Sequence, residues 1–537
     1  MTTDYRKLRE SFAWDVPEFY NIGVDVCDRQ VAEGRDVALI FVDEKGVECR
    51  YRFEDVRRLS NRLANAFVAR GASLGDRVGV FLPQSPETLV AHVAAFKAGL
   101  ISIPLFTLFG DDALAYRLFD SGARCVVTDV LGQVKLERIR ERLPALKTIL
   151  VVGGEHSDRH GFENFSLALD GASDSFVAVQ TRADDPALII YTSGTTGSPK
   201  GTLHAQRVLL GHLPGVEVSH DFFPQPEDLF WTPADWAWIG GLIDVLLPSL
   251  HHGVPVLAYR ARKFDPAEAY RLMAGHRVRN VFLPPTALKL MRQSNAQVPA
   301  SLQLRTIASG GEPLGAELLD WGRRTFGVTI NEFYGQTECN MVVANTGSVF
   351  PVRAGSMGRA VPGHDVRVVD ADGHVIAAGS VGTIGIRRPD PVMFLSYWGN
   401  DDATADKFTG DFLLTGDLAR EDDEGYLWFQ GRSDDIITSA GYRIGPVEIE
   451  ECLLKHPAVA LAAVIGVPDP IRTEVVKACI VLKPGEIASA ELETEIADFV
   501  KIRLAAHEYP RIIEFVTELP MTISGKIIRR ELRDRSR

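Results

Sequence analysis

Hydrophobic positions recur along the chain with two spacings, and the two spacings alternate. Over Phe53–Phe67 apolar side chains return every three or four positions, which predicts an amphipathic helix. RVGVF at 77–81 is short and apolar, as in a buried strand. In SPETLVAHVAAFKAG, Ser85 can cap a second helix and Pro86 can take its first position. ISIPL at 101–105 is again typical of a strand.

The same alternation continues downstream and indicates parallel sheets covered by helices. The further predicted strands lie in RCVVTD, VPVLA, RNVFLPP and TIASGGEP. Between about residues 355 and 389 the pattern changes to short strands separated by glycine turns, which fits a small β-barrel or sheet. The last hundred or so residues mix two helices with two strands, so they are expected to form a separate α+β domain.

Composition and charge narrow the class of protein. A chain of 537 residues is too long for one core and predicts two or three domains. The net charge of -13 argues against general nucleic-acid binding. The six cysteines form no C-x-x-C pair, which is typical of reduced thiols. With no signal peptide and no long apolar run, we expect a cytoplasmic protein without a membrane span.

The stretch YTSGTTGSPKG, Tyr191–Gly201, follows the apolar strand ALII and is suited to hold a polyphosphate. Its glycines let backbone N–H groups approach a ligand, its hydroxyls add donors, and Lys200 adds a positive charge. A plain surface turn would not need this set of donors. The spacing also differs from a Walker A loop, because Lys200 lies between a proline and a glycine.

Three further stretches with polar side chains follow the glycine-rich stretch along the chain. NEFYGQTE ends in Thr337 and Glu338, a hydroxyl donor and a candidate Mg²⁺ carboxylate. Far downstream, TGDLAREDDEGYLWFQGRSDDIITSAGYRIG contains Asp417 and Arg432. ISGKIIRREL places Lys526 after a Ser-Gly pair near the end of the chain.

Together these four motifs resemble those of the adenylate-forming superfamily, which includes acyl-CoA synthetases, firefly luciferase and nonribosomal peptide adenylation domains. The resemblance covers nearly the whole chain. It implies an α/β fold in which a large N-terminal domain, residues 1–432, combines two α/β sheet subdomains with a small β-barrel. Residues 433–537 would then form a mobile α+β C-terminal domain.

The resemblance also implies where ATP binds. The glycine-rich loop would hold the β- and γ-phosphates, and Gly311, Glu312 and Pro313 would border adenine. Tyr334 would stack on adenine and Glu332 would lie near its amino edge, while Asp417 and Arg432 would hold the ribose hydroxyls. Thr337 would contact the α-phosphate and Glu338 would bind Mg²⁺. The expected ATP- or AMP-binding residues are Thr192, Ser193, Gly194, Thr195, Thr196, Gly197, Lys200, Gly311, Glu312, Pro313, Glu332, Tyr334, Gln336, Asp417, Arg432 and Arg443.

The expected chemistry brings two anions together, because a carboxylate attacks the α-phosphorus of ATP. The site must therefore supply positive charge, and Mg²⁺ and Lys526 are expected to do so. The expected catalytic residues are Lys526, Thr337 and Glu338. In the family the small domain then rotates about a hinge residue, here Asp434, and coenzyme A is expected at Ser439, Ala440 and Gly441.

The acid is expected to be larger than acetate. Acetate-specific relatives carry a tryptophan before the Gln-Thr-Glu triplet and often a threonine at a second position, where this chain has Gly335 and Gly240. Both changes remove bulk. The predicted acyl pocket comprises Trp236, Trp238, Ile239, Gly240, Gly335 and Cys339, although core packing is an equal alternative for Trp236.

The resulting hypothesis is an AMP-forming acyl-CoA ligase that uses ATP, Mg²⁺ and coenzyme A on a medium-chain, branched or aryl acid. Alternatives are an enzyme that loads a carrier protein, an acetyl- or propionyl-CoA synthetase, a luciferase-like oxygenase, and a non-catalytic nucleotide-binding regulator. The sequence leaves a homo-oligomer open.

Two patterns argue for other functions and are set aside. GASLG matches a nucleophile elbow but connects a helix to a strand, the reverse of what the elbow needs. His251 and His252 lack further ligands at metal spacing and are expected to be loop residues.

Met521 replaces a lysine that many acyl-CoA synthetases carry before the catalytic lysine, a change that should leave the chemistry of Lys526 intact.

Overall fold

The computed structural model describes residues 4–154, 161–192, 199–259, 263–433, 435, 437–439, 442–469, 473–503, 509–522 and 525–536. The chain forms two compact units. The first comprises residues 1–353, 358–364 and 388–406, and the second comprises residues 354–357, 365–387 and 407–537. The predicted domain boundary between residues 432 and 433 stays a prediction.

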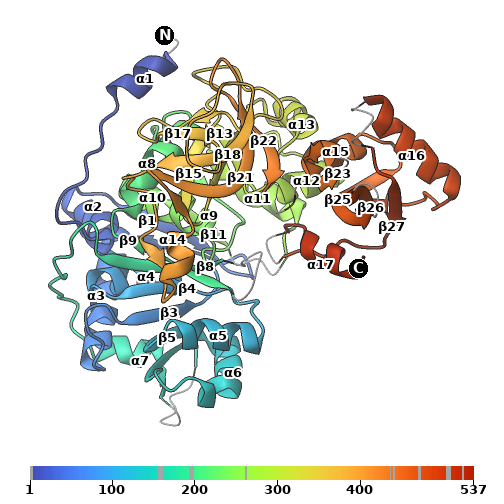
Figure 1. Cartoon of the computed structure of the whole chain (residues 1–537). Helices are drawn as coiled ribbons and strands as arrows, with labels where there is room; N and C mark the ends of the chain where they lie inside the picture. Colours follow the sequence, from blue (N-terminus) through green and yellow to red (C-terminus); the bar gives the residue numbers. More distant parts are fainter. Residues whose placement is uncertain are drawn as a thin grey trace. The chain divides into compact units, whose positions relative to one another are not determined.

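The first unit contains an eight-stranded sheet. Figure 1 labels its strands β3, β4, β5, β8 and β9. Its inner strands are parallel, and an antiparallel hairpin of β8 and β9 extends it on one side. The strand order is β19 (Ser396–Tyr397), β9 (Lys200–Ala205), β8 (Pro186–Thr192), β4 (Ile101–Pro104), β3 (Arg77–Phe81), β5 (Cys125–Asp129), β6 (Thr148–Val152) and β7 (Phe162–Asn164).

A second sheet of the first unit has nine strands and follows the same principle. Its inner strands are parallel, whereas β2, β15 and β16 join antiparallel at the two edges. The order is β16 (Arg359–Ala360), β15 (Cys339–Ala344), β14 (Ile330–Gln336), β13 (Thr306–Gly310), β12 (Asn280–Phe282), β10 (Phe230–Trp231), β11 (Val256–Tyr259), β1 (Val37–Val42) and β2 (Glu48–Arg52).

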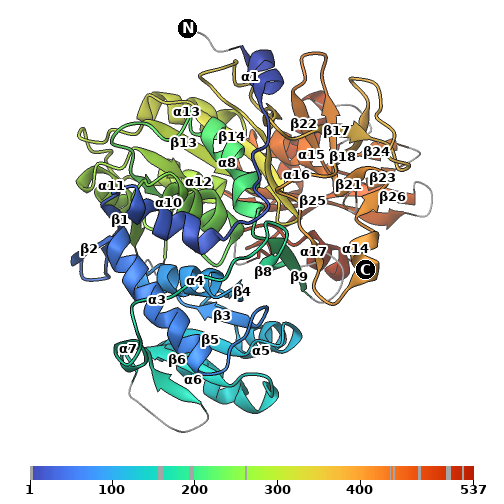
Figure 2. The same cartoon turned by 90° about the vertical axis from the view of Figure 1, so that its left-hand side faces the viewer.

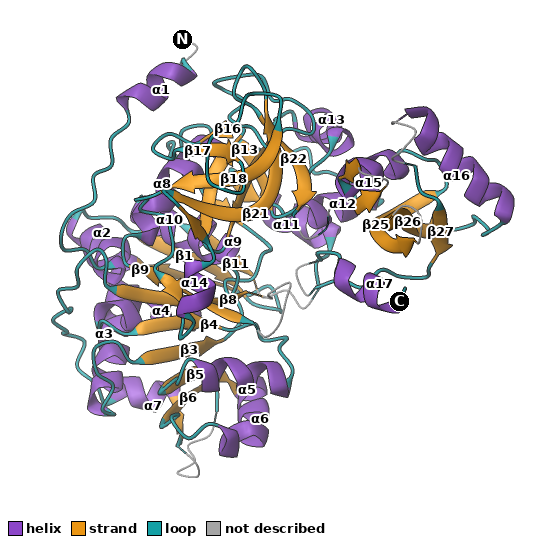
Figure 3. Cartoon of the chain, in the orientation of Figure 1, coloured by secondary structure: helices purple, strands orange, loops and turns teal. Residues whose placement is uncertain are grey.

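Helices alternate with these strands along the chain (Figure 3). They are α1 (Tyr5–Ser11), the π-helix η1 (Val24–Asp28), α2 (Arg29–Ala32), α3 (Phe53–Ala69), α4 (Pro86–Lys97), α5 (Asp111–Asp120), α6 (Val130–Ile139), the 3₁₀ turn η2 (Arg140–Arg142), α7 (Phe165–Asp170), α8 (Val208–Ser219), α9 (Ile239–Gly241), the π-helix η3 (Leu242–Leu246), α10 (Leu247–His251), α11 (Pro266–Gly275), α12 (Pro285–Gln293), α13 (Ala316–Phe326) and α14 (Asp401–Ala405).

Local signals place the early elements as predicted. Helix α3 buries one apolar face. Helix α4 begins at Pro86, and the hydroxyl of Ser85 caps it by accepting the Thr88 N–H. Strand β3 packs on helices on both of its faces, because Val80 joins the core with α3 and α4 whereas Phe81 joins the core with α5 and α6 (Figure 2). Because successive side chains of a buried strand point to opposite faces, the sheet lies as the middle layer between two layers of helices.

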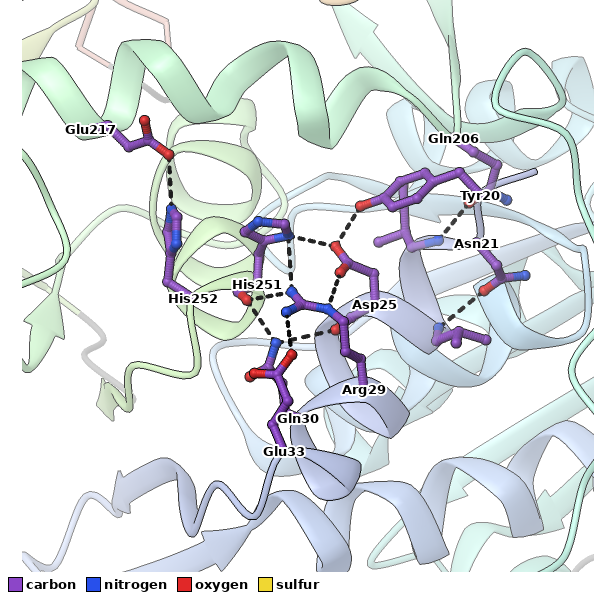
Figure 4. A network of polar contacts seen from close by, with 12 residues as sticks. Tyr20, Asn21, Asp25, Arg29, Gln30, Glu33, Gln206, Glu217, His251 and His252 are labelled. Carbon is purple, nitrogen blue, oxygen red and sulfur yellow. Dashed lines mark hydrogen bonds and ion pairs between the residues drawn. The ribbon is translucent and has the colours of Figure 1, made fainter. Parts of the chain in front are cut away.

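The prediction that His251 and His252 are loop residues is wrong for His251, whereas His252 follows α10 in a turn. His251 ends α10, and its Nδ1 lies 2.6 Å from Asp25 Oδ2 (Figure 4). Asp25 also accepts hydrogen bonds from Tyr20 and Arg29, and the His251 carbonyl accepts from Arg29 at 2.6 Å. These contacts tie η1 to the C-terminal end of α10. The network is long-range in sequence, so no local pattern indicated it.

The second unit carries two further sheets. A five-stranded antiparallel sheet consists of β17 (Val366–Val369), β18 (Val381–Arg387), β20 (Phe408–Thr409), β21 (Phe412–Glu421) and β22 (Leu427–Arg432). It confirms the predicted small β subdomain but extends beyond the predicted end near residue 389 to Arg432. The C-terminal α+β elements are β23 (Ile437–Ser439), β24 (Tyr442–Ile444), α15 (Pro446–Leu454), β25 (Val459–Asp469), β26 (Thr473–Leu482), α16 (Ala490–Arg503), β27 (Ile512–Phe515) and α17 (Arg529–Arg535). Within the described residues we find no helix with both the length and the apolar character that a membrane crossing requires.

Candidate active site

The glycine-rich loop lies between β8 and β9. Its residues Ser193, Gly194, Thr195, Thr196 and Gly197 are outside the described residues, but both of its ends are described. Thr192 pairs with Lys200 across the hairpin. Gly201 lies in a tight place, because a Cβ there would lie 3.0 Å from Cγ2 of Ile189. The sheet therefore holds both ends of the loop in register, with Lys200 at its exit.

The acidic turn lies between β14 and β15. Gln336 pairs with Cys339, so Thr337 and Glu338 form a tight return at the edge of the nine-stranded sheet. Glu338 is buried, its carboxylate Oε1 accepts the hydroxyl of Tyr397, and its carbonyl accepts the Phe394 N–H at 2.9 Å. The Nζ of Lys200 lies 5.0 Å from the centre of the Tyr397 ring. The structure therefore brings Lys200 and Glu338 to the same tyrosine.

A single carboxylate at this place fits a magnesium site. Mg²⁺ in nucleotide sites is commonly held by one or two carboxylates together with substrate phosphates and water. The one cluster of three potential metal ligands in the described part of the chain is elsewhere, in an exposed turn at Asp370, Asp372 and His374. The donor set around Glu338 thus suits an ion that arrives with a polyphosphate.

The segment predicted to border adenine follows β13. Gly311 has a φ of 95°, a conformation that favours glycine, and Glu312 lies 3.7 Å from Lys289 Nζ. Glu332 is buried behind this segment, where its Oε1 accepts the Leu314 N–H at 3.4 Å. The carboxylate therefore supports the backbone of the segment, and its predicted contact with adenine stays a prediction. Tyr334 is partly buried and Pro313 is exposed.

The predicted acyl pocket is more crowded than the two glycines suggested. A Cβ at Gly240 would lie 2.8 Å from Cε1 of Phe282 and 3.1 Å from Cζ3 of Trp238. A Cβ at Gly335 would lie 2.5 Å from Cα of Asn340. Neighbouring atoms thus already fill the space beside both glycines.

The two tryptophans of this region differ in burial. Trp236 is 1 % exposed and belongs to the hydrophobic core, in agreement with the core-packing alternative. Trp238 is half-buried and tilts against Phe282, with 5.9 Å between the ring centres. Ile239 and Cys339 are buried. Trp238 is the member of the set that best suits contact with a substrate.

In the second unit, the two residues predicted at the ribose are neighbours. Asp417 on β21 pairs with Arg432 on β22, and Arg432 Nη1 lies 3.7 Å from Asp417 Oδ1. Asp417 is buried, and its N–H donates to the Thr415 hydroxyl at 3.1 Å. The antiparallel register thus joins an acceptor and a cation that lie far apart in sequence.

Lys526 lies in a turn near the end of the second unit and is exposed. Its N–H donates to the Thr522 hydroxyl at 3.0 Å, while Met521 and Ile527 form an antiparallel bridge across the turn. Ser439 is buried on β23. The predicted hinge Asp434 and the coenzyme A residues Ala440 and Gly441 lie outside the described residues, as does the side chain of Arg443.

Sequence reasoning missed a cluster of charges beside that turn. Arg529 on α17 lies 2.7 Å from Glu450 on α15 and 3.2 Å from Asp435. Burial raises the pKa of Glu450, and Arg529 opposes the rise. Asp435 directly follows the predicted hinge, so this cluster connects two of the motifs with helix α15, which carries Glu450. The Arg-Arg pair after Lys526 was the one available signal.

Comparisons with known proteins agree with this geometry. Residues 27–398 match the family described as AMP-binding enzyme, and residues 448–526 match the AMP-binding enzyme C-terminal domain. The mitochondrial acyl-coenzyme A synthetase ACSM3 of Mus musculus is 35 % identical over 99 % of this chain and 93 % of its own length. The acetyl-coenzyme A synthetase of Bacillus subtilis is 36 % identical over 96 % of this chain and 90 % of its own.

A solved structure similar to this chain is an anthranilate CoA ligase, AuaEII, in complex with anthranoyl-AMP. It is 30 % identical, with a TM-score of 0.87, over 97 % of this chain and 98 % of that one. The Brucella canis acyl-CoA synthetase is 35 % identical, with a TM-score of 0.76, over 99 % of both chains.

Proposed function

The chain belongs to the AMP-binding enzyme family and is an AMP-forming acyl-CoA synthetase, and we propose that it activates a carboxylic acid larger than acetate. In the first half reaction the acid carboxylate attacks the α-phosphorus of ATP, which gives an acyl-adenylate and pyrophosphate. In the second, the thiol of coenzyme A attacks the acyl carbonyl, which gives acyl-CoA and AMP.

One observation carries the assignment of the ATP site. Lys200 and Glu338 come from hairpins of two different sheets, and both contact Tyr397. An ammonium group attracts phosphate oxygens directly, and a carboxylate attracts them through a divalent cation. When bound, Mg²⁺ supplies positive charge that offsets the charge of the phosphates. A lysine and a carboxylate that share a buried neighbour are therefore a suitable pair for a polyphosphate.

The remaining roles follow from charge and donor type. Thr337 supplies a hydroxyl donor beside Glu338, where it would contact the α-phosphate. Asp417 accepts from ribose hydroxyls, and Arg432 adds a charged donor. Lys526 supplies positive charge to the adenylation step, and coenzyme A binds at Ser439–Gly441. These roles, with the hinge at Asp434, are our proposal for this chain.

Trp238 supports an apolar acid larger than acetate. Its indole reaches from Gly240 to Gly311, since a Cβ at Gly311 would lie 3.3 Å from Cη2 of the ring. The six-membered ring of Trp238 therefore lies beside Gly311, in the segment proposed to border adenine, where the acyl group would meet the nucleotide. An aromatic face favours an alkyl chain or an aryl ring, and each buried methylene adds about 0.8 kcal/mol.

The test is carboxylate-dependent exchange of pyrophosphate into ATP, measured from acetate to decanoate and with benzoate. We expect exchange to be faster with a longer or aryl acid than with acetate. The same acids are then tested with coenzyme A while AMP and free acyl-CoA are followed. An acetate optimum would favour the short-chain alternative, AMP formation without free acyl-CoA would favour carrier loading, and ADP as the product would refute the function.

A further inference from the structure

The segment 394–398 connects the two hairpins of the proposed ATP site through its backbone. At one end, the Phe394 N–H donates to the Glu338 carbonyl at 2.9 Å. At the other, the Trp398 N–H donates to the Gly201 carbonyl at 2.7 Å, directly after Lys200. Between these bonds, Tyr397 pairs with Thr202 of β9. Five residues thus bridge the glycine-rich loop of one sheet and the acidic turn of the other.

The side chain of Tyr397 repeats this connection. It is 3 % exposed, its hydroxyl donates to Glu338 Oε1, and the Lys200 ammonium lies 5.0 Å from its ring centre. The hydroxyl donates a hydrogen bond to the carboxylate of Glu338, and the negative face of the ring attracts the ammonium of Lys200. A residue needed only for packing could be phenylalanine at this place, so the hydroxyl requires an explanation.

A hydrogen bond to one carboxylate oxygen sets the orientation of the other. Partners that orient a metal ligand in this way typically contribute ten- to a hundredfold to metal affinity. The ring in turn restricts the positions open to a long, flexible lysine side chain, whose rotamer freedom would otherwise be lost on binding phosphate.

We propose that Tyr397 is a positioning residue that orients Glu338 toward the metal ion of metal-bound ATP and holds Lys200 toward its phosphates. This inference rests on the proposed function. It assigns to one tyrosine the alignment of two groups from separate sheets.

The test uses Tyr397→Phe in the full chain, with binding of Mn²⁺ in the presence of ATP followed by electron paramagnetic resonance and without acid. We expect the apparent dissociation constant of Mn²⁺ to rise about ten- to a hundredfold. Tyr270→Phe is the control, because Tyr270 is also a buried tyrosine but lies in the core between α11 and its neighbours. The control should bind Mn²⁺ as the wild-type protein does.

Two further variants separate the hydroxyl from the ring. Tyr397→Leu should weaken Mn²⁺ binding as Tyr397→Phe does and also raise the KM for ATP at saturating metal by about two- to fivefold, because the ring contact to Lys200 is lost. In a Glu338→Gln background, Tyr397→Phe should have no further effect on Mn²⁺ binding. Equal effects in both backgrounds would contradict action through Glu338.

The outcomes separate this inference from the function on which it rests. If the wild-type protein shows no ATP-dependent Mn²⁺ binding, the proposed ATP site fails. If the wild-type protein binds Mn²⁺ with ATP and Tyr397→Phe changes the affinity by less than twofold, the ATP site stands and the role of Tyr397 is refuted.

Discussion

Replacing Arg529 with methionine is expected to destabilise the second unit by about 3 kcal/mol. Arg529 makes a two-pronged contact with Glu450, at 2.7 and 2.9 Å, and a third contact with Asp435 at 3.2 Å. Glu450 also accepts the Val464 N–H at 2.8 Å and is nearly buried. The methionine would keep the apolar length of the side chain but would leave a buried carboxylate without its cation.

The magnitude follows from that geometry. Breaking one partner of a buried ion pair costs about 3 to 5 kcal/mol. Arg529 is 18 % exposed, and Arg533 still contacts Asp435 in the variant, so the lower end of the range applies. Arg530→Met is a matched control on the same helix, since Arg530 is 62 % exposed and faces Asp534 at 3.7 Å. Exposed pairs contribute about 0 to 1 kcal/mol.

Native-state hydrogen exchange at the amides of β25 and β26 measures the opening free energy of the second unit. Its dependence on pH adds an independent check. Burial raises the pKa of Glu450 above the usual value of a glutamate, and loss of Arg529 should raise this pKa further. A carboxyl with a raised pKa in the folded state contributes stability at low pH and loses it as the pH rises through that pKa. The variant should therefore approach the wild-type protein as the pH falls toward the raised pKa of Glu450 and differ most at pH values above it. Equal losses in both arginine variants, or a deficit independent of pH, would refute the reasoning.

Three further predictions concern both units. Lys526→Ala should slow adenylation about a hundred- to a thousandfold while sparing thioester formation from supplied acyl-AMP, and normal pyrophosphate exchange by the variant would exclude the lysine from the first step. Gly335→Ala should lower stability to urea by about 1 to 3 kcal/mol, because its Cβ would lie 2.5 Å from Cα of Asn340, whereas Gly275→Ala, with open space around it, should not. Burial lowers the pKa of His204 to about 3, so between pH 6 and 4 the unfolded chain binds a proton that the folded chain does not, and the free energy of unfolding falls as the pH falls. His204→Leu should reduce the slope of the free energy of unfolding against pH by about 1.4 kcal/mol per pH unit. An unchanged slope in urea titrations would argue against this role of His204.

Local patterns were sufficient for the strongest elements but not for the short ones or for the contacts: the C-terminal region contains β23, β24, β27 and α17 besides the two helices and two strands that were predicted. Helix α4 begins at Pro86 because its cap and its first-turn proline are adjacent in sequence. The contact between Tyr397 and Glu338 spans 59 positions, and no spacing rule connects them. The glycines were similarly ambiguous: a missing side chain at Gly335 indicates either an open pocket or a close backbone approach, and the structure shows the approach of Asn340.

The two groups proposed to hold the polyphosphate, Lys200 and Glu338, lie at antiparallel hairpins of two sheets whose inner strands are parallel, and this placement has a structural reason. Parallel strands require long crossover connections, whereas antiparallel strands can return through a short turn whose ends stay paired. Thr192 and Lys200 are such a pair, as are Gln336 and Cys339. Segment 394–398 then bonds to both returns. Because side chains in a strand alternate with a period of two, a one-residue change of register in β19 would turn Tyr397 away from Glu338 and Lys200 although neither partner had changed. The alignment of the two charged groups therefore depends on the register of a two-residue strand as much as on the groups themselves.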